Sequence, residues 1–134
     1  MAYSVLVIDD EVNIRKALDG VLSDEGYRVS LAESAEKGVE LLSRSMVDAV
    51  LLDVWLPGID GLEALRQIRQ VYPLLPVIMI SGHGTIDMAV KAVKNGAFDF
   101  IEKPISLNKL LITLSRAIER EILQSENVEL KERM

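Results

Sequence analysis

The most regular feature of this sequence is a series of short apolar runs separated by longer, mixed segments. The runs are rich in Val, Ile and Leu and are short enough to be strands rather than buried helices. They are SVLVI (4–8), a more mixed YRVSLA (27–32), DAVLLD (48–53), PVIMI (76–80) and FDFIE (98–102). Runs of this length and composition predict five β-strands.

The segments between these runs carry apolar residues at three- and four-residue spacing, which is typical of helices with one buried face. The first such segment carries Ala17, Leu18, Val21 and Leu22, and the fifth begins near Leu107. The chain is therefore predicted to repeat a strand–helix pair five times. Because continuously apolar strands need cover on both faces, we expect a doubly wound α/β fold with a five-stranded parallel sheet and five helices.

Residues that commonly begin and end helices occur where this fold needs them. Ser34, Thr85 and Ser106 are predicted N-caps, and Gly26 and Gly96 stand where the first and fourth helices are expected to end. Beyond its core-facing residues the fifth helix meets no Gly or Pro, so we expect it to be extended. The composition there changes to mixed charge, which predicts a solvated helix or a linker.

Composition excludes several classes of function. The chain has 134 residues, 49% of them hydrophobic, which is enough for one domain with one core. With 15 Lys and Arg against 21 Asp and Glu, the net charge of -6 argues against direct binding to nucleic acid or anionic lipid. The absence of cysteine excludes disulfides and thiolate sites, and no signal peptide or long apolar span is evident, so we expect a cytoplasmic protein.

Charged and hydroxyl side chains follow four of the predicted strands. Asp9 and Asp10 end the first, Asp53 the third and Ser81 the fourth, and Lys103 follows the fifth. In a doubly wound sheet, ligands bind beyond the carboxyl ends of the strands, which lie at one edge. We therefore expect three carboxylates, one hydroxyl and one ammonium group to converge there.

Three neighbouring carboxylates repel one another unless a cation compensates them. Mg²⁺ prefers oxygen ligands and commonly shares its sphere between carboxylates and a phosphate, so Asp10 and Asp53 are candidate ligands. Asp53 stands alone after its strand and is the better candidate for a nucleophile in phosphoryl transfer, with Lys103 as a second positive charge. The plainer alternative is that Asp10 and Glu11 only stabilise the start of a helix through its dipole.

Four motifs occur in order at suitable separations: VIDDE, LLDVWLPGIDG, MISGHG and DFIEKP. Together they make the chain, from residue 4 to about 121, resemble the receiver domain of bacterial two-component response regulators. The resemblance implies a flavodoxin-like sheet with strand order 2-1-3-4-5. It also implies a phosphorylation-activated switch that promotes its own phosphotransfer and dephosphorylation, rather than an enzyme acting on an outside substrate.

The resemblance assigns the site residues as well. Asp53 is implied to be the phosphoacceptor, with a sensor histidine kinase as the donor. Mg²⁺ is implied to bind Asp10, Asp53 and the backbone carbonyl of Trp55, with Asp9 acting through a water molecule. Lys103 is implied to contact the phosphoryl group and to precede Pro104 through a cis bond.

Ser81 and Phe100 are implied to form the switch. Ser81 stands where the family usually has Thr and keeps the hydroxyl that binds the phosphoryl group. Phe100 stands where Tyr is common; it can change rotamer but cannot donate a hydrogen bond. Trp55 and His83, two residues after Asp53 and Ser81, are expected to flank the phosphoryl group, and a catalytic role for His83 is not expected.

Within the family, the stretch SGHGTIDMAVKAVKNGAFDFIEKP most resembles receivers of nitrogen-regulator-type activators that act with an alternative sigma factor. This implies a receiver at 1–121 and a helical linker at 122–134 leading toward an output domain absent from this chain. ATPase and DNA-binding domains are expected in the full-length protein. The regulated process is then transcription, and the receiver itself is expected to contact neither nucleic acid nor membrane.

Two other functions remain open at this point. A haloacid-dehalogenase-type phosphatase also uses an Asp nucleophile, Mg²⁺ and a lysine, but it needs a second Asp two residues after the nucleophile, where this chain has Trp55. A degenerate receiver that never accepts phosphate is the third reading. The complete set of Asp10, Asp53, Ser81 and Lys103 argues against it.

Apolar residues continue past the expected end of the core. Leu123, Asn127, Leu130 and Met134 alternate at four- and three-residue spacing, as in the seam of a short coiled coil. We therefore expect a homodimer, through this tail or through the face formed by the fourth helix, fifth strand and fifth helix. A single solvated helix leading to the next domain is the alternative.

Overall fold

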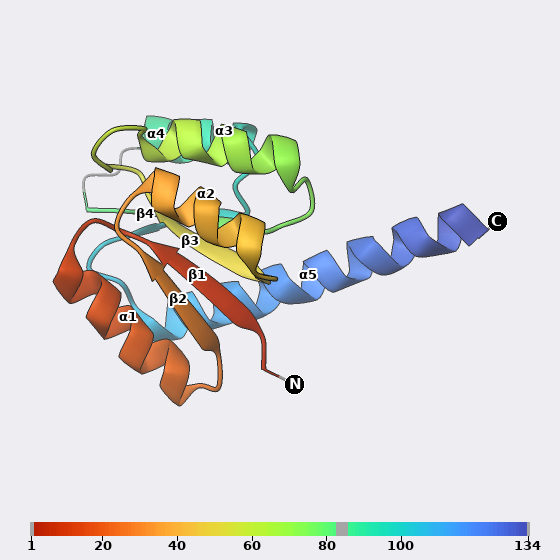
Figure 1. Cartoon of the computed structure of the whole chain (residues 1–134), viewed down its shortest axis with the longest axis horizontal. Helices are drawn as coiled ribbons and strands as arrows, with labels where there is room; N and C mark the ends of the chain where they lie inside the picture. The colour runs from red at the N-terminus through yellow and green to blue at the C-terminus, as the bar shows by residue number, and fades with distance from the viewer. Residues whose placement is uncertain (1, 83–85, 134) are drawn as a thin grey trace.

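A computed structural model describes residues 2–82 and 86–133, with side chains placed as far as Gln124. Strands and helices alternate along the chain (Figure 1), as the sequence predicts. The elements are β1 (Ser4–Ile8), α1 (Val12–Asp24), β2 (Arg28–Ala32), α2 (Ala35–Arg44), β3 (Ala49–Asp53), α3 (Gly61–Val71), β4 (Val77–Ser81), α4 (Ile86–Lys94), β5 (Asp99–Glu102) and α5 (Leu107–Arg133).

The five strands form one parallel sheet in the order β2-β1-β3-β4-β5. This confirms the predicted flavodoxin-like order. β2 lies on one side of β1 and β3 on the other, so the order of the strands reverses between β1 and β3. The carboxyl ends of β1 and β3 therefore lie side by side. In the register of that pair Ile8 stands opposite Leu52, so the residues following both strands meet at one edge.

The sheet is covered on both faces, and this explains why its central strands are apolar throughout. All five residues of β3 and of β4 are buried. One face packs against α2, α3 and α4, and the other against α1 and α5 (Figure 1). Alternate residues of a strand therefore enter different cores: Leu52 lies on the side of α3, whereas Leu51 lies on the side of α5.

Several helix ends follow the predicted signals. The hydroxyl of Ser34 accepts a hydrogen bond from the backbone N–H of Lys37 at 3.2 Å, which caps α2. Gly26 and Gly96 follow α1 and α4 with φ of 92° and 99°, the left-handed conformation that glycine adopts without a steric penalty. Ser106 precedes α5 and accepts a long bond of 3.4 Å from Lys109. Thr85, the third predicted cap, lies outside the described residues.

The fifth helix is much longer than the others, as predicted. Its core-facing side contributes Leu110, Leu114, Ala117 and Ile118 to the layer against the sheet. Beyond these residues the helix continues to Arg133 and projects away from the sheet (Figure 1). Within residues 2–82 and 86–133, none of the helices has both the length and the apolar composition needed to cross a lipid bilayer.

Candidate functional site

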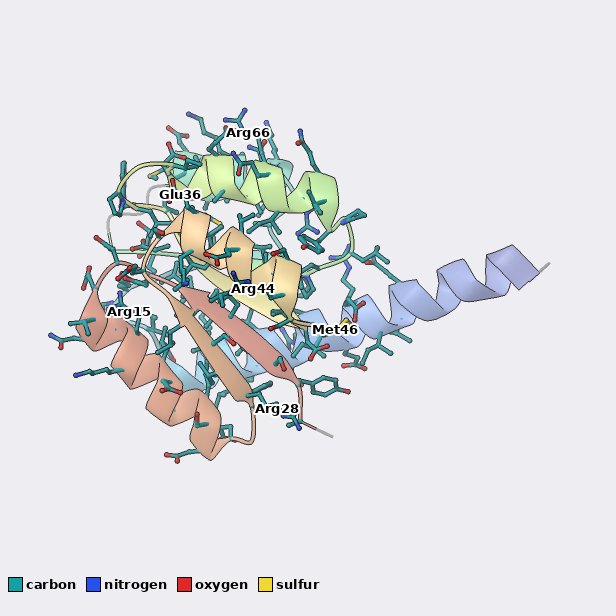
Figure 2. The ribbon with its side chains drawn as sticks, viewed as in Figure 1. Arg15, Arg28, Glu36, Arg44, Met46 and Arg66 are labelled. Carbon is teal, nitrogen blue, oxygen red and sulfur yellow. The ribbon has the colours of Figure 1, made fainter. Side chains whose placement is uncertain are left out.

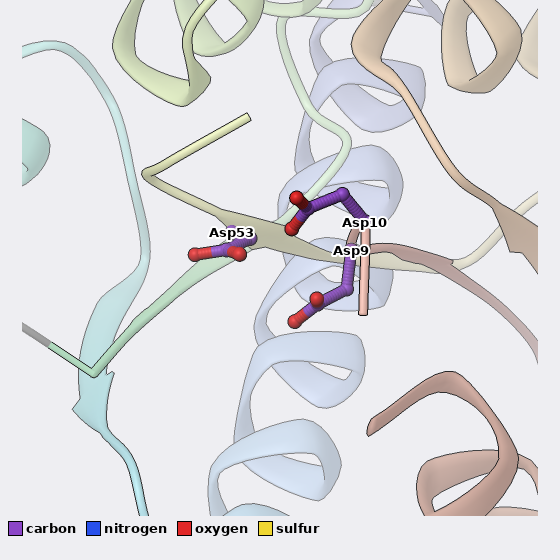
Figure 3. Close-up of side chains that lie close together, drawn as sticks. All are labelled: Asp9, Asp10 and Asp53. Atoms are coloured by element: carbon purple, nitrogen blue, oxygen red, sulfur yellow. The ribbon is translucent and has the colours of Figure 1, made fainter. Parts of the chain in front are cut away.

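The carboxyl edge of the sheet brings three aspartates together. Asp9 and Asp10 follow β1, and Asp53 is the last residue of the neighbouring β3. A carboxylate oxygen from each lies within 4.8 Å of the others, and Figure 3 shows the side chains of Asp9 and Asp10 extending toward the side of Asp53. Asp9 and Asp53 are buried, whereas Asp10 is exposed, so the group forms a site open to solvent on one side.

Backbone hydrogen bonds fix the two buried carboxylates. One oxygen of Asp9 accepts a bond of 2.9 Å from the N–H of Glu11, and one oxygen of Asp53 accepts a bond of 3.3 Å from the N–H of Trp55. Each carboxylate is thus held by the residue two positions ahead, in the manner of an Asx turn. The second oxygen of each is the one that faces Lys103.

Lys103 brings a positive charge to this group from the loop after β5. Its Nζ lies 2.9 Å from Asp9 and 3.5 Å from Asp53, and its side chain is only 13% exposed. The 2.9 Å contact with Asp9 is the shortest of the ion pairs that Lys103 makes with the described residues. Burial lowers the pKa of Lys103, but contact with Asp9 and the charges of Asp53 and Glu11 outweigh it, so its pKa lies above the ordinary value.

The site carries more negative charge than Lys103 compensates. Burial, and then the nearby charge of Asp9, raise the pKa of Asp53 from 3.8 to about 6, against the opposing effects of Lys103 and the Trp55 N–H. A cation among the three aspartates would relieve this repulsion. Because all the ligands on offer are carboxylate oxygens, the site fits a hard divalent ion such as Mg²⁺.

Ser81 and Lys103 come from adjacent strands and are tied together through the backbone. Ser81, the last residue of β4, is fully buried, and its carbonyl accepts a bond of 2.8 Å from the N–H of Lys103. The predicted cis bond between Lys103 and Pro104 is present. In the same strand pair Phe100 stands opposite Met79, where it is half-buried and packs against the core layer that includes α4. The predicted switch residues thus lie two rows apart on neighbouring strands.

The loop between β3 and α3 is pressed tightly against Asp53. The N–H of Gly61 donates a bond of 2.9 Å to the carbonyl of Val54, and a Cβ on Gly61 would collide with the backbone oxygen of Asp53. In this loop Trp55 is 53% exposed. His83, the other predicted flanking residue, lies outside the described residues.

Two residues at the site have contacts that the sequence reading did not assign. Arg15 donates a bond of 2.7 Å from Nη1 to the backbone carbonyl of Asp9, and Figure 2 labels it on α1. Glu11, interpreted as a helix-start residue, lies 3.6 Å from Lys103 through its carboxylate. Glu11 is the extended residue before α1 and Arg15 lies in the first turns of α1, so no helical spacing relates their side chains.

Comparison with known proteins gives one consistent result. The family model described as "Response regulator receiver domain" matches residues 5–115. A putative NtrX-like response regulator of Rickettsia conorii is 48% identical over 132 residues, which are 97% of this chain and 28% of that protein. The chain therefore spans less than a third of the length of this relative.

Solved structures agree in fold and in sequence. Superposition on NtrX from Brucella abortus in complex with ADP gives a TM-score of 0.92 at 44% identity, over 97% of this chain and 30% of that one. The beryllofluoride-activated NtrC4 receiver domain dimer gives 0.84 at 38% identity, over 88% of this chain and 98% of that one.

These likenesses agree with the resemblance to nitrogen-regulator-type receivers that the motifs indicated. They also agree with the arrangement of the site, in which three aspartates lie together and Lys103 lies beside Asp9. The chain belongs to the response regulator receiver domain family rather than to the haloacid-dehalogenase-type phosphatases.

Proposed function

We propose that this domain is a phosphorylation-activated switch in which Asp53 accepts a phosphoryl group from a phosphohistidine of a sensor kinase. The observation that carries the proposal is the convergence of Asp9, Asp10 and Asp53 with Lys103 at the carboxyl edge of the sheet. The beryllofluoride-activated NtrC4 receiver, whose fold this chain shares, supports it.

The chemistry needs a carboxylate nucleophile and compensation of charge. A carboxylate oxygen of Asp53 attacks the phosphorus, the P–N bond to the histidine breaks, and its electron pair stays on the nitrogen. Lys103 neutralises part of the charge on the transferred group. Asp10, Asp53 and the carbonyl of Trp55 would hold Mg²⁺, with Asp9 acting through water, and the ion would supply further positive charge when bound.

The response to phosphorylation is proposed to begin at Ser81 and pass to Phe100. Ser81 ends the strand beside Asp53, so its hydroxyl can turn to the phosphoryl group with little movement of the backbone. Phe100 is half-buried beneath α4, a position from which a change of rotamer alters the exposed face of α4 and β5. The aromatic ring acts by packing alone, because it has no hydroxyl.

The assignment of Asp53 is tested by incubation with acetyl phosphate and Mg²⁺ followed by intact mass measurement. We expect a phosphate-sized gain in the wild type and none in Asp53→Asn. Asp87→Asn, which alters an exposed carboxylate on α4, is the control and should keep the gain. Turnover of acetyl phosphate without a stable gain would indicate a phosphatase. No reaction in the wild type would indicate a degenerate receiver.

The proposed metal site is tested through Trp55, the only tryptophan. Trp55 is about half-exposed and its backbone N–H donates to a carboxylate oxygen of Asp53, so Mg²⁺ binding should change its fluorescence. We expect a saturable change in the wild type. In Asp10→Asn, the loss of one charged ligand should weaken the apparent affinity for Mg²⁺ by roughly tenfold or more. Identical titrations of the two proteins would place the ion elsewhere.

We propose the same division of the chain and the same partners as the sequence suggested. Residues 1–121 form the receiver and residues 122–134 a helical linker toward an output region. In the full-length protein that region would contain ATPase and DNA-binding domains and would control transcription in the cytoplasm. The receiver would act as a homodimer, and the existence of an activated NtrC4 receiver dimer supports this.

A further inference from the structure

Glu11 is placed differently from what its sequence position suggests. It immediately precedes α1, but its side chain makes no capping hydrogen bond there. Its carboxylate instead lies 3.6 Å from Nζ of Lys103. The contact joins the start of α1 to the loop after β5, two segments that each border Asp53.

Lys103 therefore has three carboxylate neighbours that differ in mobility. Asp9 and Asp53, at 2.9 Å and 3.5 Å, are buried and held by backbone N–H groups. Glu11 is 61% exposed and can leave Lys103 for solvent at little cost. Of these three, Glu11 is the one that can yield its contact when a phosphoryl group arrives.

We propose that Glu11 is a positioning residue that competes with the phosphoryl group for Lys103 and so lowers the phosphorylated fraction of this domain. This inference rests on the proposed function. In the unphosphorylated domain Glu11 holds the ammonium group toward α1. In the phosphorylated domain the phosphoryl oxygens take its place, and the Glu11 charge then faces a like charge, which favours loss of the phosphoryl group.

Removal of the Glu11 charge should change the affinities for Mg²⁺ and for a phosphoryl mimic in opposite directions. Removing the charge of Glu11 takes a negative charge from the rim of the aspartate group, so Mg²⁺ should bind less tightly. It also removes one of the three carboxylates that attract Lys103, together with the repulsion of the phosphoryl charge, so a phosphoryl mimic should bind more tightly once Mg²⁺ is saturating. A residue that only maintained the loop, or that ligated the ion, would weaken both when changed.

The test is Glu11→Gln, which keeps the size of the side chain and removes its charge. Beryllofluoride binding is titrated at saturating Mg²⁺, and Mg²⁺ binding is titrated alone, both through Trp55 fluorescence. For an ion pair with one exposed partner, we expect beryllofluoride to bind roughly two- to fivefold tighter and Mg²⁺ to bind weaker by a similar factor. The gain should shrink at high salt, where exposed charges are screened.

Glu102→Gln is the matched control. Glu102 is the exposed residue immediately before Lys103, and within the described residues it forms no ion pair with that lysine. It should leave beryllofluoride affinity unchanged. Equal or weaker beryllofluoride binding in Glu11→Gln, or an equal gain in Glu102→Gln, would overturn the proposal. Failure of the wild type to bind beryllofluoride would instead count against the proposed function.

Discussion

At the scale of single residues, Asp53 combines burial with a nearby like charge, and this makes it costly to ionise. Its pKa is raised from 3.8 to about 6, so the folded protein holds the proton more tightly than the unfolded chain does. The resulting stabilisation is complete below pH 3.8 and is lost as the pH rises through about 6. Without a divalent ion, wild-type stability should therefore fall across this range.

Asp53→Asn removes that titration while keeping the volume of the side chain. Without divalent ions at about pH 7.5, we expect the variant to be more stable than the wild type by roughly 1–3 kcal/mol, with a smaller difference at about pH 5. Urea unfolding in a chelator at both pH values measures this. A difference that does not change with pH would show that ionisation of Asp53 is not responsible.

The residues of the site were predictable where a strand end fixes their position, and not where the side chain can adopt rotamers that point either to the site or to solvent. Asp9, Asp53 and Lys103 follow strands whose ends meet at one edge, so their meeting follows from topology. Glu11 and Arg15 lie at the start of a helix, where a long side chain can turn either to solvent or to the site. Their contacts with Lys103 and with the Asp9 carbonyl depend on rotamers that the sequence pattern does not specify.

At the scale of elements, the loop between β3 and α3 depends on Gly61 for its close approach to Asp53. A methyl group at this position would meet the backbone oxygen of Asp53 and the Cα of Val54, so part of the loop must move. We expect Gly61→Ala to lower the free energy of unfolding by about 1–3 kcal/mol and to weaken Mg²⁺ binding, because the Trp55 carbonyl moves with the loop. Urea unfolding and the fluorescence titration measure the two effects.

Gly20→Ala is the control for this change and has the opposite sign. Gly20 lies within α1, is exposed, and has no atom within 4 Å of an added Cβ. Alanine there should stabilise the protein by about 0.5–1 kcal/mol through the difference in helix propensity and leave Mg²⁺ binding unchanged. If Gly61→Ala proved as harmless as Gly20→Ala, the close packing of the loop would not be a constraint on the site.

The order and type of all ten elements followed from the apolar pattern, because the central strands are almost continuously apolar and the helices carry apolar residues on one side. Their ends were less well specified. The second, third and fifth strands begin one residue later than the apolar runs indicate, at Arg28, Ala49 and Asp99, and β4 is shifted by one residue to Val77–Ser81. The ladder of hydrogen bonds ends where a neighbouring strand ends, and this partner is not visible in the local sequence.

At the scale of the whole molecule, exposed apolar residues gather on the face formed by α4, β5 and α5 and along the projecting helix. Ile86, Val90 and Val93 on α4 are 84%, 45% and 55% exposed, and Ile112 on α5 is 52% exposed. Farther along α5, Leu123 is 55% exposed. Exposed apolar side chains on both surfaces are suited to contact with a second copy of the chain.

The projecting part of α5 is the better candidate for the dimer contact. Its backbone is helical as far as Arg133, although isolated helices of this kind are marginal in water. Leu123 begins the spacing expected of a short seam, with Asn127 at a position where a polar residue can set the register. Among the side chains that the structure describes, the last buried one of α5 is Ile118, and Ile122 beyond it is partly buried against the core, so a chain shortened after Arg120 loses one partly buried apolar side chain.

Sedimentation equilibrium on the full chain and on a chain ending at Arg120 would separate the two surfaces. The shorter chain keeps the guanidinium of Arg120 over the ring of Phe98, 5.8 Å from its centroid, and keeps every buried residue of the core, although it loses the partly buried Ile122. We expect the full chain to be dimeric at tens of micromolar. The shorter chain should associate more weakly by roughly tenfold or more, because truncation removes the short coiled-coil seam. Beryllofluoride should change the dimer dissociation constant of the full chain. A dimer that survives truncation would move the contact to the face of α4, β5 and α5. Monomers in both chains, with and without beryllofluoride, would contradict the proposed homodimer.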